Sequence, residues 1–205
     1  METTRPTLLK RLRDPGDQSA WREFDARYRE LVLRVCLRSG LQAADAEDVR
    51  QVTMMGLARA LPGFVYRPEV GRFRDYLGTV VRNAIRRHRA RQGRGAEVLV
   101  GDVAELSDPA DGEDAWSEGW NEEWKLHHYR LAMARVRASF RPRSLAVFDG
   151  LLEGRTGEEL AREHGMTPEE VYKVKQRIRD RLRELIARQL REEEWSGDGT
   201  GEARA

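Results

Sequence analysis

The segment TPEEVYKVKQRIRDRLREL, residues 167–185, decides how the C-terminal part of this chain folds. Lys or Arg occupies every second position from Lys173 to Arg183, which alone would suit a strand with one basic face. The apolar residues of the same segment recur instead in steps of three and four, and this spacing predicts a helix. They are Val171, Val174, Ile178, Leu182 and Leu185. Thr167, Pro168 and Glu170 supply an N-cap, a first-turn proline and a capping-box acid, so we predict a helix rather than a strand.

A second capped helix is predicted directly before this one. Thr156-Gly157-Glu158-Glu159 fits another capping box, and Gly165 can adopt the left-handed conformation that ends a helix. Two helices joined by a short turn with glycine form a helix-turn-helix, whose second helix enters the DNA major groove with its first turns. An ordinary antiparallel helix pair with a solvated charged face is the alternative. The candidate DNA-contacting residues are Thr167, Glu169, Tyr172, Lys173, Gln176, Arg177 and Arg179.

Three further helices are predicted before residue 95. Asp17 can cap the first, which Gly40 ends, and the second begins near Asp45 and stops at Pro62-Gly63. The third is predicted over 72–92, with an apolar side and a side rich in arginine. Six arginines and no acid lie between residues 82 and 94. Such a row can neutralise phosphates, although cations at a helix C-terminus also complement the helix dipole.

Composition and charge distribution favour an all-α protein with two basic parts. The chain has 205 residues, of which 35% are charged. Its formal net charge is only +2, but acidic and basic residues are concentrated in different segments. Residues 97–123 contain ten acids and no Lys or Arg. We therefore predict a helical domain over 1–94, an acidic flexible linker over 95–120, a helix-turn-helix domain over 121–192 and a disordered tail over 193–205.

Several classes of function find no support in the sequence. There is no apolar run of the ~20 residues that span a membrane and no secretory signal pattern, so we predict a cytoplasmic protein without membrane contact. The single cysteine, Cys36, lies in an apolar run and is expected to be buried. No phosphate-binding glycine loop, Cys-x-x-Cys pair or Gly-x-Ser-x-Gly motif occurs, so we expect no enzyme, no cofactor and no metal.

Two smaller patterns have ordinary explanations. His127 and His128 with Glu123 could ligate a metal, but helical spacing favours a solvated face. Trp116, Trp120 and Trp124 recur at every fourth position, which suits a helix packed on one of the domains, or a docking site for an inhibitor, better than a cofactor site.

Two stretches of the chain resemble a known family. DAEDVRQ (45–51) followed by FRDYLGTVVRNAIRRHRAR (73–91) resembles region 2 of bacterial RNA polymerase sigma factors. The C-terminal helix-turn-helix, with VYKVKQRIRDRLREL (171–185), resembles region 4. The short two-domain layout is similar to extracytoplasmic-function (ECF) sigma factors. The resemblance covers 18–94 and 125–190, and it implies a region 2-like helical bundle and a region 4-like helix-turn-helix joined by the acidic linker.

The resemblance implies that the first domain binds core RNA polymerase. The core-binding residues would be Asp45, Glu47, Asp48 and Gln51. Val52 stands where the family usually has an acid, which could weaken or reshape this contact. Plain capping of the helix dipole is the alternative explanation of the acidic first turn.

The resemblance also assigns the two DNA elements of a promoter. The residues facing the −10 element would be Arg72, Arg74, Tyr76, Arg82, Asn83, Arg86 and Arg87, with a flipped base against the loop 64–72. Tyr76 keeps an aromatic ring where the family often has Trp. The −35 element would be read as duplex by the helix-turn-helix, where Tyr172 replaces a frequent Lys and suggests an altered base preference.

These observations lead to three hypotheses. The first is a sigma factor that binds core RNA polymerase and directs promoter recognition, DNA melting and transcription initiation, with promoter DNA and an anti-sigma factor as further partners. The second is a stand-alone helix-turn-helix transcriptional regulator that binds duplex DNA without core polymerase, and the third is a protein-binding adaptor. The linker would either enter the RNA path of the polymerase, as the resemblance implies, or act only as a solvated tether.

Overall fold

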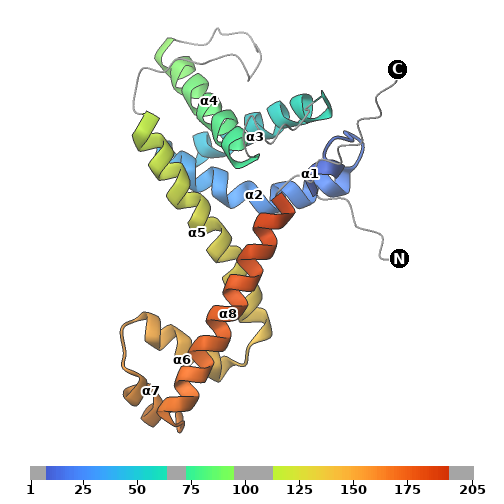
Figure 1. The fold of residues 1–205 in the computed structure, drawn as a ribbon. Coiled ribbons are helices and arrows are strands. Elements are labelled where there is room, and N and C mark those ends of the chain that lie inside the picture. Colours follow the sequence, from blue (N-terminus) through green and yellow to red (C-terminus); the bar gives the residue numbers. More distant parts are fainter. Residues whose placement is uncertain (1–7, 64–72, 95–112, 194–205) are drawn as a thin grey trace, which may run out of the picture. The chain divides into compact units, whose positions relative to one another are not determined.

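The computed structural model of the protein describes residues 8–63, 73–94 and 113–193 (Figure 1). These residues form helices and no strand, which confirms the all-α prediction. The helices are α1 (Leu8–Arg11), α2 (Gln18–Arg38), α3 (Ala43–Ala60), the 3-10 helix η1 (Leu61–Gly63), α4 (Phe73–Arg94), α5 (Glu113–Ser139), α6 (Pro142–Leu152), α7 (Gly157–His164) and α8 (Pro168–Glu193). Among these residues, no helix combines the length and the apolar character that a membrane span requires.

The chain divides into two compact units. The first comprises Met1–Trp124 and Arg191–Ala205, and the second comprises Lys125–Leu190. The boundaries therefore fall inside α5 and α8, whereas the sequence predicted domains over 1–94 and 121–192. Part of the predicted linker, 95–112, lies outside the described residues, and its last part belongs to α5.

The first unit is built around α2, α3 and α4. The side chain of Asp17 accepts a hydrogen bond of 2.8 Å from the backbone N–H of Ala20, so it caps α2 as predicted. Gly40, at φ 85°, follows the end of α2, and this left-handed conformation suits glycine. Phe24, Tyr28 and Phe73 pack their rings together in the core between α2 and α4, with centroids 4.6–6.0 Å apart.

The start of α5 packs on the first unit through its tryptophans. Trp120 and Trp124 are buried in the core of this unit, and Trp116 packs against it. Trp120 lies over Gly78 of α4 so closely that a Cβ atom at position 78 would come within 2.8 Å of the ring. The prediction that the Trp stripe packs on one of the domains is confirmed.

The last residues of α8 also belong to the first unit. The Tyr28 hydroxyl donates a hydrogen bond of 2.6 Å to the carboxylate of Glu193, and Arg27 pairs with Glu192 at 3.2 Å. Burial is the main cause that raises the pKa of Tyr28 well above its usual value. Glu193, at the start of the predicted tail, is helical and buried.

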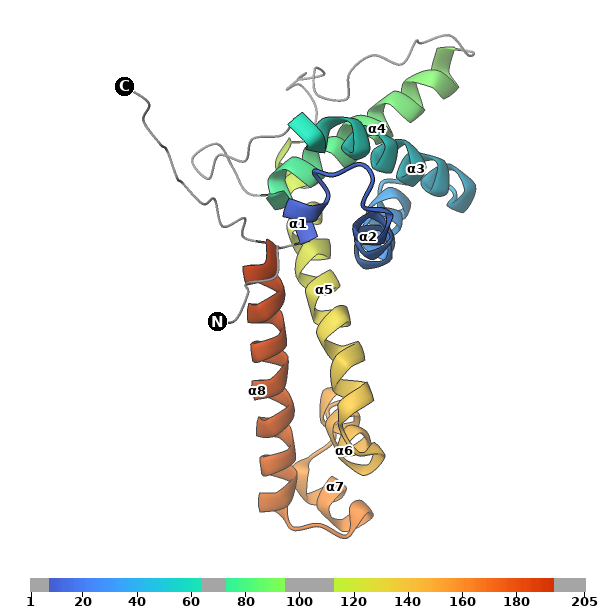
Figure 2. The ribbon, with the colours of Figure 1, turned by 90° about the vertical axis from the view of Figure 1, so that its right-hand side faces the viewer.

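The second unit packs the end of α5, α6, α7 and most of α8 around one core (Figure 2). The apolar stripe of α8 that the sequence predicted is buried in this core from Val171 to Leu185. Arg137 of α5 donates two hydrogen bonds, of 3.0 and 2.9 Å, to the carboxylate of Asp149 in α6. This bidentate pair fixes one helix against the other.

The two histidines of α5 are not on a solvated face, and that prediction is wrong. His127 and His128 are each only 2% exposed. His128 Nδ1 lies 2.8 Å from the side-chain oxygen of Gln189 in α8, and Gln189 is buried as well. The local sequence does not show the contact between His128 and Gln189, because the two residues are 61 positions apart.

Candidate nucleic-acid and polymerase interfaces

The helix-turn-helix consists of α7, the turn at Gly165 and the beginning of α8. Thr156 and Glu159 form a capping box at the start of α7, with hydrogen bonds of 3.2 and 2.9 Å. Thr167 and Glu170 repeat this arrangement at the start of α8, at 3.2 and 2.7 Å. Gly165 has φ 58° and ψ 47°, the left-handed conformation predicted for it. The caps and the glycine thus set where each helix of the motif begins and ends.

Arg143 of α6 holds this turn from outside the motif. Its guanidinium donates hydrogen bonds to the backbone carbonyls of His164 and Gly165, the latter at 2.9 Å. These carbonyls lie at the C-terminal end of α7, where backbone acceptors lack helical partners. Sequence reasoning missed Arg143, because its contact bridges 21–22 positions and leaves no periodic signal.

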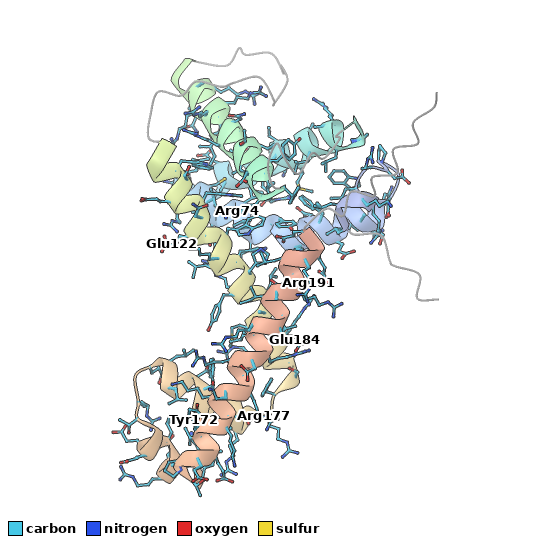
Figure 3. The ribbon with its side chains drawn as sticks, viewed as in Figure 1. Arg74, Glu122, Tyr172, Arg177, Glu184 and Arg191 are labelled. Carbon is cyan, nitrogen blue, oxygen red and sulfur yellow. The ribbon has the colours of Figure 1, made fainter. Side chains whose placement is uncertain are left out.

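The first turns of α8 present polar side chains to the solvent. Tyr172 is 60% exposed, and Lys173, Arg177 and Arg179 are exposed as well. Figure 3 shows Tyr172 and Arg177 on this part of α8. The side-chain amide of Gln176 donates a hydrogen bond of 3.0 Å to the Tyr172 hydroxyl, so these two side chains are oriented together. The helix therefore offers cations and a phenol on one exposed surface, with the half-buried amide of Gln176 beside them.

Two of the predicted residues in this motif have local structural contacts. The Arg177 guanidinium lies 5.9 Å from the ring centroid of Phe140, which restrains the side chain by a cation–π contact. Thr167 is exposed, but its hydroxyl caps α8. Glu169 is also exposed, in the first turn of the helix.

The predicted polymerase-binding residues of α3 lie in different environments. Asp48 and Gln51 are exposed, whereas Asp45 is half-buried and its Oδ1 lies 3.2 Å from His88 Nε2 of α4. Glu47 is half-buried too. Asp48 and Gln51 are thus the pair best placed to meet a partner protein.

Glu47 ties α3 to α2 through an ion-pair network. Its carboxylate lies 2.6 Å from Arg50 and 3.1 Å from Arg29, and Arg50 also contacts Asp25 of α2. The hydrogen bond from Arg50 is the main cause that lowers the pKa of Glu47 below its usual value. The structure therefore gives Glu47 an internal role beside the one predicted for it.

An exposed methionine extends the surface of Asp48 and Gln51. Met55 is 56% exposed and lies one helical turn after Gln51, so the two side chains share a face of α3. Sequence reasoning missed it, because methionine in a helix is normally counted as core. An apolar residue in register with Asp48 and Gln51 is the signal that could have found it.

The predicted −10 residues of α4 are distributed over its surface and its core. Arg74, Tyr76, Arg82, Arg86 and Arg87 are half-buried. Burial raises the pKa of Tyr76. The Arg82 guanidinium lies 6.0 Å from the ring centroid of Trp116 in α5.

Two residues of the same predicted set stand apart. Asn83 is only 3% exposed, so its side chain lies inside the first unit rather than on its surface. Arg72 and the loop 64–72 lie outside the described residues. The roles assigned to all these residues stay predictions.

Metal binding has no support in the described part of the chain. No cluster of three or more His, Cys, Asp or Glu side chains suited to a metal ion occurs among those residues. Cys36, which the sequence predicted to be buried, is inside the core, and burial raises the pKa of its thiol to about 12.

Comparison with known proteins supports part of the predicted family. No curated protein matches the chain. The family model of sigma-70 region 2 matches residues 24–95. The match begins within α2 and ends one residue after α4, so it includes the helical bundle that carries the candidate polymerase surface and the basic helix. Residues 24–95 are therefore similar to sigma-70 region 2, and this similarity supports a sigma factor role in promoter recognition with RNA polymerase.

Proposed function

We propose that the protein is a sigma factor of the ECF type, which binds core RNA polymerase and directs promoter recognition, DNA melting and transcription initiation. Its partners in this proposal are core polymerase, promoter DNA and an anti-sigma factor. Residues 1–94 act as region 2, residues 95–120 as the linker and residues 121–192 as region 4. The protein supplies binding surfaces rather than catalytic groups.

The observation that carries the proposal is the combination of two features in one chain. Residues 24–95 match region 2, and a capped helix-turn-helix follows with cations on the first turns of its second helix. A duplex-binding motif alone would suit an ordinary regulator. A region 2 domain before it adds a binding site for polymerase, which an ordinary regulator does not need.

The side chains of α8 and of α4 suit different DNA elements of the promoter. Lys173 and Arg177 can contact guanine edges or phosphates in the major groove of the −35 element, and Gln176 suits adenine. Arg82, Arg86 and Arg87 on α4 suit the phosphates of the −10 element, where melting is expected. The buried Asn83 would support α4 from inside rather than touch DNA.

The proposal is tested by run-off transcription with the full chain, core polymerase and promoter DNA selected from a random library. We expect specific transcripts only when the protein and core polymerase are both present. Tight, specific duplex binding by the protein alone, with no core-dependent transcript, would show the stand-alone regulator instead.

Lys173→Ala tests the −35 contact in the same assay. We expect promoter binding to weaken by about 1–3 kcal/mol, the cost of losing one good base contact. Arg183→Ala is the matched control, because Arg183 is an exposed cation further along α8 that pairs with Asp180 at 3.3 Å. Equal effects of the two substitutions would contradict the assignment.

A further inference from the structure

The first turns of α8 carry two side chains that are joined to each other before any DNA is bound. Tyr172 and Gln176 lie one helical turn apart, and the Gln176 side-chain nitrogen donates a hydrogen bond of 3.0 Å to the Tyr172 hydroxyl. Tyr172 is 60% exposed, whereas Gln176 is half-buried. Figure 3 shows Tyr172 on the part of α8 that follows α7. The phenol is therefore the more accessible member of the pair.

The geometry of the Gln176 amide does not suit direct reading of adenine. Glutamine recognises adenine with two hydrogen bonds, which require its side-chain oxygen and nitrogen at the same base edge. The nitrogen already donates to Tyr172, and the side-chain oxygen is buried, with no hydrogen-bond partner among the described residues. In this arrangement Gln176 holds Tyr172 rather than a base, although its chemistry alone would suit adenine.

The same hydrogen bond sets the polarity of the Tyr172 hydroxyl. A phenol has one hydrogen to donate and can also accept a hydrogen bond. Since Gln176 is the donor in this pair, the Tyr172 oxygen is the acceptor, and its own hydrogen remains to be donated to another group. The exposed side chain thus offers a hydrogen-bond donor, rather than an acceptor, to a molecule bound at α8.

A donor in the major groove distinguishes the bases by one group. Guanine and thymine carry a carbonyl oxygen there, which accepts a hydrogen bond, whereas adenine and cytosine carry an amino group, which donates one. The inference rests on the proposed function, in which the first turns of α8 enter the major groove of the −35 element. We propose that Tyr172 selects guanine or thymine at one position of that element, and that Gln176 is the positioning residue that makes the Tyr172 hydroxyl a donor.

The role of Tyr172 is tested by selecting −35 sequences from a random duplex library with the full chain, with and without core polymerase. At one position the wild type should favour guanine or thymine about 2- to 10-fold, the range of a single neutral hydrogen bond. Tyr172→Phe keeps the ring and removes the hydroxyl, so it should lose this preference at that position alone. The proposal is overturned if the position that responds to Tyr172→Phe prefers adenine or cytosine in the wild type, or if no position responds.

Gln176→Glu tests the positioning role, because it reverses the polarity of the pair. A carboxylate can only accept, so the Tyr172 hydroxyl would donate to it and offer a lone pair to the DNA. We expect the selection at this position to move to adenine or cytosine. In the Tyr172→Phe background the same substitution should not alter the base preference. An effect of Gln176→Glu that persists without the hydroxyl would mean that Gln176 itself reads the base, and an unchanged preference would mean that Gln176 does not orient Tyr172.

Gln176→Met separates the hydrogen bond from the size of the side chain. Methionine has a similar length and no amide, so the Tyr172 hydroxyl could then both donate and accept, and the preference should shrink without reversing. Thermal unfolding should show a stable variant, since the substitution removes a buried oxygen without a partner among the described residues. Lys175→Met, at the neighbouring half-buried position, is the matched control and should leave the base preference unchanged. Equal effects of the two substitutions would contradict the role of Gln176.

The arms with and without core polymerase separate this proposal from the proposed function. Specific selection by the chain alone, unaffected by core polymerase, would contradict a sigma factor and would still test Tyr172 on the selected duplex. Core-dependent selection in which neither Tyr172 nor Gln176 alters the base preference would contradict only the roles given to these two residues. If no duplex is selected in either arm, both proposals are wrong.

Discussion

At the scale of single residues, Gly78 shows how the absence of a side chain can decide where a helix docks. The absence of a Cβ atom lets the Trp120 ring lie directly against α4. Gly119, next to Trp120 in α5, has no neighbouring atom within 4 Å of the position where a Cβ would lie. The two glycines are thus a matched pair, one required by packing and one not.

Gly78→Ala should destabilise the protein by about 1–3 kcal/mol, because a new methyl group in a tightly packed place forces the Trp120 ring to shift. Gly119→Ala should instead stabilise it by about 0.5–1 kcal/mol, since alanine favours a helix over glycine. Urea denaturation measures both changes. A stabilising Gly78→Ala would mean that α5 does not rest on α4 at this point.

Cys36 provides a second residue-scale test, of burial in the first unit. Its thiol is inside the core, and burial raises its pKa to about 12, so almost no thiolate exists near neutral pH. We expect no reaction with a thiol reagent at pH 8 in the folded protein and rapid reaction in urea. If the thiol of the folded protein reacted as fast as it does in urea, Cys36 would not be buried in the core.

At the scale of elements, capping side chains set the limits of the helix-turn-helix. Glu159 accepts a hydrogen bond of 2.9 Å from the backbone N–H of Thr156, and this bond is the main cause that lowers its pKa below the usual 4.5. A lowered carboxyl pKa in the folded state stabilises the fold above the unfolded pKa. That contribution is lost as the pH falls from 4.5 through the folded-state value.

Glu159→Gln should therefore reduce the loss of stability of the protein between pH 6 and pH 3. Glutamine can still form the capping box but does not titrate, so the cap itself remains. Thermal unfolding followed by circular dichroism at a series of pH values measures the effect. A variant whose pH dependence equals that of the wild type would show that this carboxylate does not contribute.

At the scale of the whole molecule, the exposed face of α3 is the surface proposed to meet polymerase. Asp48, Gln51 and Met55 are exposed on it, while Glu47 is engaged in the ion pairs with α2. A large apolar side chain with polar neighbours is a common centre of a protein interface. We expect this face, rather than Glu47, to determine affinity for core polymerase.

Met55→Ser should weaken binding of core polymerase several-fold and change the stability of the protein by less than about 0.5 kcal/mol, as is usual for surface positions. Leu37→Ser is the matched control, because Leu37 is also a large apolar side chain, 49% exposed, in the same unit. Affinity measured by fluorescence anisotropy should be unchanged in the control. If both variants bind as the wild type does, polymerase uses another surface.

The sequence by itself determined most of the helices, the caps at Asp17, Thr156 and Thr167, and the helix-turn-helix, although it predicted neither α1 nor the start of α5. These features depend on residues within a few positions of each other, such as Thr156 with Glu159 and the left-handed Gly165. The same local rules predicted the buried stripe of α8. Local interactions are sufficient to predict these features, because each hydrogen bond or apolar step lies within one helical turn.

Only the tertiary structure decided which helices cover which side chains. It buries His127 and His128, seats Trp120 on Gly78, and joins Tyr28 to Glu193 across 165 positions of sequence. It also brings four arginines and two tryptophans around one cavity. Each of these outcomes requires the packing of helices that are distant along the chain, and periodicity within one helix carries no information about its partner.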